Sequence, residues 1–258
     1  MSDAAAAAIP SVMAGAEPLS AAGGPNGALV LHGFTGNPQS MRGLAEAFAA
    51  AGFTVEMPRL PGHGTTVEDM LTTNWSDWSA AAEAAYADLA GRCENVVVAG
   101  LSMGGTLTCW LATKHPEIAG IVAINAAVEP SADSFMEAVR GMRETGAEVM
   151  DGIGSDIADP DVKELAYAST PLEPLLSLFG AVSELATHLG DIRCPTLIFT
   201  SWQDHVVPPS SSDLLAERVS GPVERVYLER SYHVATLDYD RGEIESRSVE
   251  FARKVTAG

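Results

Sequence analysis

The chain has 258 residues, a formal net charge of −19 and a hydrophobic fraction of 47%. This length and composition fit one large domain with a substantial core. The negative charge argues against a nucleic-acid partner, whose phosphates would be repelled, and against docking on anionic lipid surfaces. The sequence holds no run of 18 apolar residues, so we expect no membrane-spanning helix and no integral membrane association.

The first residues and the cysteines bear on the cellular compartment. Residues 1–10 lack the basic start of a secretion signal, and we expect them to form a disordered tail. Cys93, Cys109 and Cys194 are an odd set without metal-ligand spacing, which favours buried thiols in a reducing compartment. We therefore expect a cytoplasmic protein, with no metal site and no organic cofactor.

Short apolar runs alternate with helical patterns along the chain. Strands are predicted at Ala28–His32, Thr54–Met57, Asn95–Gly100, Gly120–Asn125, Thr196–Thr200 and Val223–Leu228. Helices are predicted at Pro38–Ala51, at a stripe from Trp75 to Leu89 capped by Asn74 or Thr73, and at Ile244–Val255. This alternation predicts an α/β fold, a mostly parallel central sheet with helices on both faces. Sites in such sheets lie at the carboxyl ends of the strands.

One stretch interrupts the alternation. About 70 residues without a strand signal separate the predicted strand at Gly120–Asn125 from the one at Thr196–Thr200, too many for a plain loop. The stretch holds helix-like pieces rich in Met and Leu. We interpret residues 128–190 as a small inserted cap over the site, with 11–127 and 191–258 as the core; the alternative is a helix pair packed on the sheet.

A serine stands at the junction of a predicted strand and a predicted helix. Ser102 lies in a Gly-x-Ser-x-Gly pattern, after the apolar run Val96–Val98 and before the helix-like run Thr106–Lys114. On such a strand–turn–helix the serine hydroxyl projects into a pocket, and glycines flank it because the turn leaves no room for a Cβ. Ser102 is therefore a candidate nucleophile; the alternative is an ordinary glycine-rich turn.

A serine nucleophile needs a base, and the base needs an acid to orient it. Of the six histidines, His233 combines a loop after a predicted strand with a position near the C-terminus. The expected order in the chain is serine, acid, histidine. Asp204 fits that order because it follows the strand at 196–200, whereas Asp191 precedes this strand and Asp238 follows His233.

The reaction also requires two donors for an oxyanion. The backbone N–H that follows the nucleophile, at Met103, is one candidate. The second is the N–H of Phe34, in the glycine-containing loop 32–36 after the first predicted strand.

Several of these segments resemble known sequences. The segments His32–Phe34, Pro61–Gly64, Gly100–Gly105, Asp204–Pro208 and Ser231–Val234 resemble the α/β-hydrolase superfamily. The segments Gly33–Gly36, Ile124–Val128, Asp161–Tyr167 and Tyr232–Tyr239 are more closely similar to bacterial monoacylglycerol lipases and their small carboxylesterase relatives. The similarity extends from about residue 14 to residue 255.

The resemblance implies roles for three further residues at the substrate. Glu164 matches a cap residue that contacts the glycerol head group, Ile153 matches a gating position at the acyl channel, and Asn125 falls in a segment matched at the site. Without the resemblance, Glu164 reads as an exposed helical glutamate beside Lys163. The segment 129–150 departs from the family pattern, which leaves the preferred acyl length open.

The expected reaction is ester hydrolysis through an acyl-enzyme, with a small-molecule lipid ester, most simply a monoacylglycerol, as substrate. One alternative is a general carboxylesterase for short-chain esters. Another is a hydrolase-fold binding protein without catalysis, although such a protein has no need for an ordered serine, acid and histidine. The sequence leaves the oligomeric state open.

Overall fold

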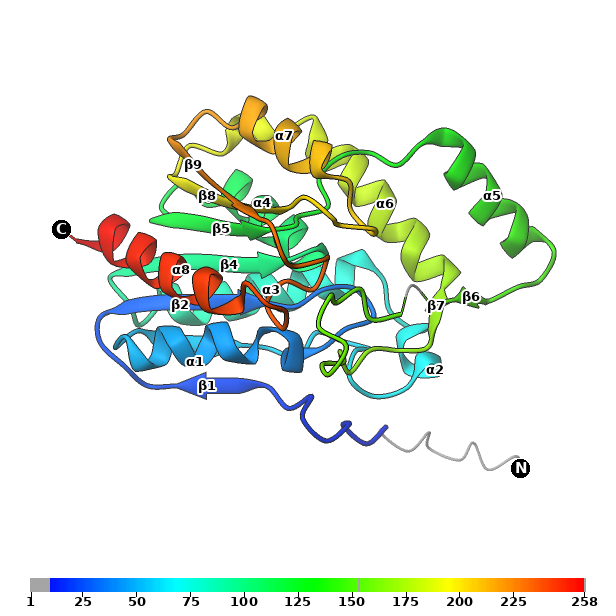
Figure 1. Cartoon of the computed structure of the whole chain (residues 1–258), viewed down its shortest axis with the longest axis horizontal. Coiled ribbons are helices and arrows are strands. Elements are labelled where there is room, and N and C mark those ends of the chain that lie inside the picture. The colour runs from blue at the N-terminus through cyan, green and yellow to red at the C-terminus, as the bar shows by residue number, and fades with distance from the viewer. Residues whose placement is uncertain (1–9, 153, 258) are drawn as a thin grey trace, which may run out of the picture.

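The structure, a computed structural model, describes residues 10–152 and 154–257 and is built on a seven-stranded sheet (Figure 1). The strands of the sheet are β1 (Leu19–Ala21), β2 (Asn26–Leu31), β3 (Thr54–Met57), β4 (Asn95–Leu101), β5 (Gly120–Ile124), β8 (Thr196–Ser201) and β9 (Val223–Leu228). Their order is β1-β3-β2-β4-β5-β8-β9. Every neighbouring pair is parallel except β1 with β3, which is antiparallel.

Helices cover both faces of this sheet. The helices of the described residues are α1 (Arg42–Ala50), α2 (Val67–Met70), α3 (Trp75–Ala90), α4 (Met103–Lys114), α5 (Asp133–Glu144), α6 (Leu172–Ala186), α7 (Pro209–Arg218) and α8 (Arg241–Thr256), with short 3-10 helices η1 (Pro38–Met41) and η2 (Leu189–Asp191), and not all of them lie on the sheet. Helices α1 and α8 pack side by side on one face, whereas α3 and α4 lie on the other (Figure 1). The predicted α/β architecture is confirmed.

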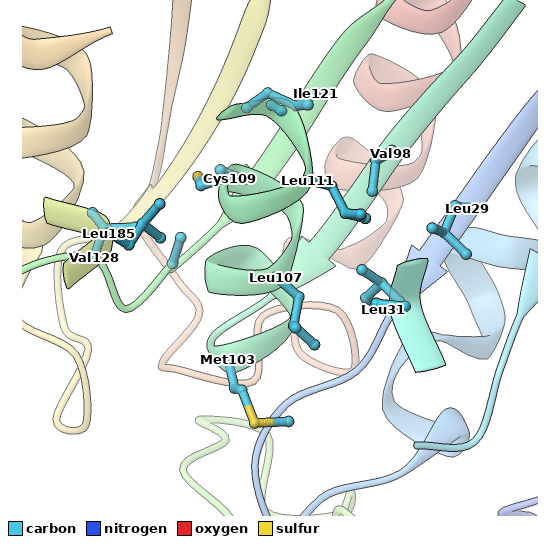
Figure 2. Packing of buried hydrophobic residues seen from close by; sticks show 14 of the residues in the cluster. Leu29, Leu31, Val98, Met103, Leu107, Cys109, Leu111, Ile121, Val128 and Leu185 are labelled. Carbon is cyan, nitrogen blue, oxygen red and sulfur yellow. The ribbon is translucent and has the colours of Figure 1, made fainter. Parts of the chain in front are cut away.

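The central strands are buried on both faces, which explains their continuous apolar runs. In β4, Val96 and Val98 belong to the core beneath α3 and α4, while Val97 and Ala99 belong to the core beneath α1 and α8. Figure 2 shows the first of these cores, with Leu107 and Leu111 of α4 facing strand residues such as Leu31 and Val98. This packing holds the serine at the start of α4 on a rigid support.

The six strands predicted for the sheet are found, with bounds that differ by no more than two residues. The helix from Trp75 begins after a capping box in which Asn74 accepts from the N–H of Ser76 and the Asp77 carboxylate accepts from the N–H of Asn74. Asn74 is thus the cap, and Thr73 is not. The edge strand β1 was not predicted, because its alternation of apolar and polar residues extends over only three residues, too few to recognise.

The inserted stretch is not free of strands, so that expectation is wrong. β6 (Val149–Asp151) pairs antiparallel with β7 (Ser169–Pro171), so this part of the stretch does not form one of the helix-like pieces rich in Met and Leu. Each strand has three residues, too few for a recognisable pattern. The pair and α5 lie beyond the carboxyl ends of the parallel strands (Figure 1).

Helix α6 packs against both the body of the protein and the rest of the inserted stretch. Leu178, Val182 and Leu185 belong to the core beneath α3 and α4. Near its start, Leu175 joins Val139 of α5 in a separate small cluster. The inserted cap, its alternative of a helix pair packed on the sheet, and the division at residues 128 and 190 all stay predictions. The predicted tail, residues 1–10, lies almost entirely outside the described residues.

Candidate active site

Ser102 occupies a sharp turn between β4 and α4. Its φ of 56° is in the left-handed region that few residues other than glycine adopt. A Cβ added at Gly100 would lie 2.1 Å from the Gly104 carbonyl oxygen, and one added at Gly104 would lie 2.1 Å from the Leu31 carbonyl oxygen. These approaches give the steric reason for both glycines, and they favour the nucleophile interpretation over an ordinary turn.

The predicted base and acid are in contact. His233 Nδ1 lies 2.8 Å from Asp204 Oδ2, and both side chains are buried. The other carboxylate oxygen, Oδ1, accepts the backbone N–H groups of Val206 and Val207, each at 2.8 Å. Asp204 is thereby held in one orientation. Because Nδ1 faces the carboxylate, Nε2 is the ring nitrogen that can take a proton from a nucleophile.

Ser102 and His233 line one cavity of about 580 Å³. Phe34, Thr35 and Glu164 line it as well. Much of the remaining wall is apolar and comes from the inserted stretch and the loop after β8: Phe135, Met150, Leu175, Leu178, Phe179 and Val206. The cavity thus combines a reactive polar end with an apolar surface suited to a hydrocarbon chain.

The two predicted oxyanion donors border this serine. A Cβ added at Gly33 would lie 3.4 Å from the Ser102 Cβ, so the backbone that leads into Phe34 passes close to the nucleophile. Met103 is the first residue of α4, where backbone N–H groups lack helical partners and favour negative charge. Both positions suit the stabilisation of an oxyanion.

The ring of His32, to which the sequence assigns no role, holds the same loop. Its Nε2 lies 3.1 Å from the backbone N–H of Leu60, which can only donate, so Nδ1 carries the proton and donates to the Gly33 carbonyl at 2.9 Å. The Gly33 carbonyl and the Phe34 N–H belong to the same peptide group, so the His32 ring helps to orient the predicted oxyanion donor. Burial lowers the pKa of His32 to about 4, which keeps the ring neutral and this tautomer fixed.

Glu164 lies in an irregular segment of the inserted stretch and lines the cavity, so it is not an exposed helical glutamate. A Cβ added at Gly36 would lie 2.7 Å from its Oε1, so the carboxyl fills space that a glycine leaves. Burial raises the pKa of Glu164 to about 7, although His233 and a hydrogen bond with Ser40 act in the opposite direction. The carboxyl therefore titrates near neutral pH.

Asn125 is placed differently from the expected substrate contact. It is buried, and its amide donates to Ser201 Oγ and to the His233 carbonyl while its oxygen accepts the Ser201 N–H. These bonds occupy the side chain and join β5 to the loop that carries the base. We therefore reinterpret Asn125 as a residue that supports His233. Ile153, the expected gating position, lies outside the described residues.

A strained serine after a parallel strand, a buried Asp–His pair and a backbone loop beside the serine define an α/β-hydrolase. Residues 25–240 match the family model Hydrolase_4, described as serine aminopeptidase, S33. The chain belongs to this family of serine hydrolases.

Individual relatives extend along most of the chain. A thermostable monoacylglycerol lipase from Bacillus sp. (strain H-257) is 51% identical over 247 residues, which cover 94% of this chain and 96% of the relative. A carboxylesterase from Bacillus subtilis (strain 168) is 27% identical over 241 residues, covering 93% and 97%.

Solved structures agree with this assignment. One described with LipS and LipT, two metagenome-derived lipolytic enzymes, superposes with a TM-score of 0.90 at 46% identity and covers 95% of this chain and 100% of its own. A monoacylglycerol lipase from Paleococcus ferrophilus has a TM-score of 0.75 at 19% identity, covering 93% and 100%, and shows the shared fold.

Proposed function

We propose that the protein hydrolyses monoacylglycerols to glycerol and a fatty acid. The observation that carries this proposal is Glu164. Its polar carboxyl lines the same cavity as Ser102 and His233, whereas much of the remaining wall of that cavity is apolar. An ionised carboxylate can accept hydrogen bonds from both free hydroxyls of a monoacylglycerol, which an apolar surface cannot do. The relative that is 51% identical and named as a monoacylglycerol lipase supports it.

The proposed reaction has two halves. The Ser102 hydroxyl attacks the ester carbonyl while His233 Nε2 takes its proton, and Asp204 stabilises the imidazolium that forms. The N–H groups of Phe34 and Met103 hold the oxyanion. His233 then protonates the departing glycerol oxygen and leaves Ser102 acylated. Water, deprotonated by His233, attacks the acyl-enzyme and releases the fatty acid.

The inserted stretch supplies the acyl contacts in this proposal. Phe135 of α5, Met150 of β6 and Phe179 of α6 contribute apolar surface to the cavity, and burial of a chain there is favourable by about 0.8 kcal/mol per methylene. Helix α5 exposes Phe135 and Met142, so apolar surface continues outside the cavity.

We also propose a cytoplasmic location. Cys93, Cys109 and Cys194 are free thiols, which is typical of reducing compartments. Among residues 10–152 and 154–257, no helix is long and apolar enough to cross a membrane.

A substrate panel with one substitution tests the proposed substrate. The wild type should prefer a monoacylglycerol to a 4-nitrophenyl butyrate, and Glu164→Ala should lower kcat/KM for the monoacylglycerol by about 10- to 100-fold, as expected when charge-assisted hydrogen bonds of about 1.5–3 kcal/mol are lost. Butyrate hydrolysis should change much less. Glu184→Ala, at an exposed position on α6, is the control.

If Glu164→Ala lowered kcat/KM equally for both esters, Glu164 would not be a residue that recognises glycerol. A wild type that cleaves the butyrate but not monoacylglycerols would favour a general carboxylesterase, the activity named for the 27% identical relative.

A further inference from the structure

A short part of the inserted stretch touches both loops that carry the proposed acid and base. We call residues 154–159 the strap. The strap contacts the loop after β8, which bears Asp204, and the loop after β9, which bears His233. The inserted stretch is therefore attached to the catalytic loops as well as forming the wall of the cavity.

Asp156 makes most of these contacts. Its Oδ2 accepts the backbone N–H of His205 and the backbone N–H of His233, each at 3.1 Å. Its Oδ1 lies 2.8 Å from Nδ1 of the His205 ring. One carboxylate thus joins the residue that follows the acid to the base itself. The Asp156 side chain is only 13% exposed, so water competes little for these bonds.

A second carboxylate also joins the strap to the loop after β9, but this one belongs to the loop and accepts from the strap. Asp238, fully buried in the loop that follows β9, accepts the N–H groups of Ala158 and Asp159 in the strap at 2.7 and 3.1 Å, and also that of Tyr232 at 2.9 Å. The backbone N–H of Val234 donates to the Asp156 carbonyl at 3.0 Å. These bonds do not use the Asp156 side chain, so we expect the strap to stay docked when that side chain is truncated.

We infer that Asp156 is a positioning residue: through the backbone of His205 and His233 it fixes the distance between the acid loop and the base loop. This inference rests on the proposed roles of Asp204 and His233. Asp204 is itself held by N–H groups of its own loop, and Asn125 holds the His233 carbonyl. Besides the direct bond between Asp204 and His233, Asp156 bonds to the backbone of both loops from outside them. Misplacement of a reacting group by about 1 Å can lower a rate by about 100-fold.

Asp156 also borders the cavity, so direct substrate binding is the competing role. The two roles differ in kinetics. Loss of a positioning residue lowers kcat with little change in KM, whereas loss of a substrate contact that is equally strong in ground and transition states raises KM.

The test compares Asp156→Ala, Asp156→Asn and Asp161→Asn with the wild type. Asp161→Asn removes the same charge from an exposed position a few residues beyond the strap and is the matched control. The substrate is 4-nitrophenyl butyrate, which has no glycerol group, and rates are expressed per serine labelled by a fluorophosphonate probe. Thermal unfolding of each variant reports whether it folds.

Asp156→Ala should lower kcat by about 10- to 100-fold with KM within twofold of wild type. Asp156→Asn keeps an oxygen that can accept both N–H groups, so its kcat should be within about threefold of the wild-type value. Asp161→Asn should match the wild type. If Asp156→Ala does not fold, His205→Ala, which removes the ring contacts with Asp156 and Tyr232 and leaves both backbone bonds in place, should lower kcat more than twofold.

Three results would overturn the inference: a kcat for Asp156→Ala, or for His205→Ala as its replacement, within twofold of wild type; a rise in KM alone; or an Asp156→Asn variant as slow as Asp156→Ala. A wild type that cleaves the butyrate but no monoacylglycerol would refute the proposed substrate and leave this test intact. A wild type inactive on both esters would refute both.

Discussion

Glu164 places a partly buried carboxyl in a site where the proposed contact with glycerol requires that carboxyl to be charged. Its raised pKa, about 7, means that the folded protein holds this proton more tightly than the unfolded chain does. Below about pH 4.5 both states carry the proton. As the pH rises toward 7, the unfolded chain releases it and the folded protein does not, so Glu164 lowers the stability increasingly, and the full loss is reached above pH 7.

Glu164→Gln should therefore stabilise the protein at alkaline pH. Gln does not ionise, so we expect the free energy of unfolding to rise by about 1 to 3 kcal/mol at pH 8, and by less than half of that gain at pH 5.5. Urea unfolding at the two pH values measures the difference. A gain that is equal at both, or absent at pH 8, would mean that the ionisation of Glu164 does not oppose folding.

Residues with a fixed chain context could be predicted, and those that act through space could not. Ser102 lies in a Gly-x-Ser-x-Gly pattern between a strand and a helix, and Asp204 and His233 follow later strands in the expected order, so local pattern and chain order together select them. The ring of His32 and the carboxylate of Asp156 work through contacts with backbone atoms far away in sequence. No local pattern marks such contacts, and the same holds for the bonds from the Asn125 amide to Ser201 and to the His233 carbonyl.

At the scale of elements, the turn between β4 and α4 depends on close backbone packing. Helix propensity alone predicts that alanine stabilises a helical glycine by about 1 kcal/mol. Gly104 lies in α4, but its missing Cβ is the space in which the Leu31 carbonyl of β2 sits. Steric overlap with backbone should outweigh propensity there, since overpacking against atoms that cannot rotate away costs about 1–3 kcal/mol or more.

Gly104→Ala should accordingly lower the free energy of unfolding by more than about 2 kcal/mol. Gly180→Ala on α6 is the matched control, because a Cβ there meets nothing within 4 Å, and it should raise stability by about 0.5 to 1 kcal/mol. Denaturant unfolding of both variants measures whether each substitution lowers or raises the free energy of unfolding. A stable Gly104→Ala protein would show that β2 and α4 can separate without loss.

The sheet could be predicted closely because each of its central strands is buried on both faces and therefore continuously apolar. The inserted stretch could not. Its strands, β6 and β7, are three residues long and lie outside the main sheet, and the segment around Glu164 is held by contacts such as the bond between Leu165 N–H and the Gln39 side chain. Its structure follows from docking on the body, which no periodicity encodes.

At the scale of the whole molecule, a strongly acidic chain encloses an apolar cavity. The charge of −19 opposes lasting contact with anionic lipid surfaces or nucleic acid. A single amphiphile that leaves its aggregate and enters the cavity is consistent with both features. The 51% identical relative, which is named as a monoacylglycerol lipase, supports this proposal of a small lipid ester as substrate.

Ser102→Ala is the decisive variant for the proposed acyl transfer from a monoacylglycerol to Ser102. The Ser102 side chain makes no capping bond to α4, so alanine should leave the unfolding transition unchanged. We expect monoacylglycerol hydrolysis, measured as released fatty acid, to fall by at least about 10⁴-fold, together with loss of fluorophosphonate labelling. A folded Ser102→Ala protein that retains wild-type turnover would contradict the account.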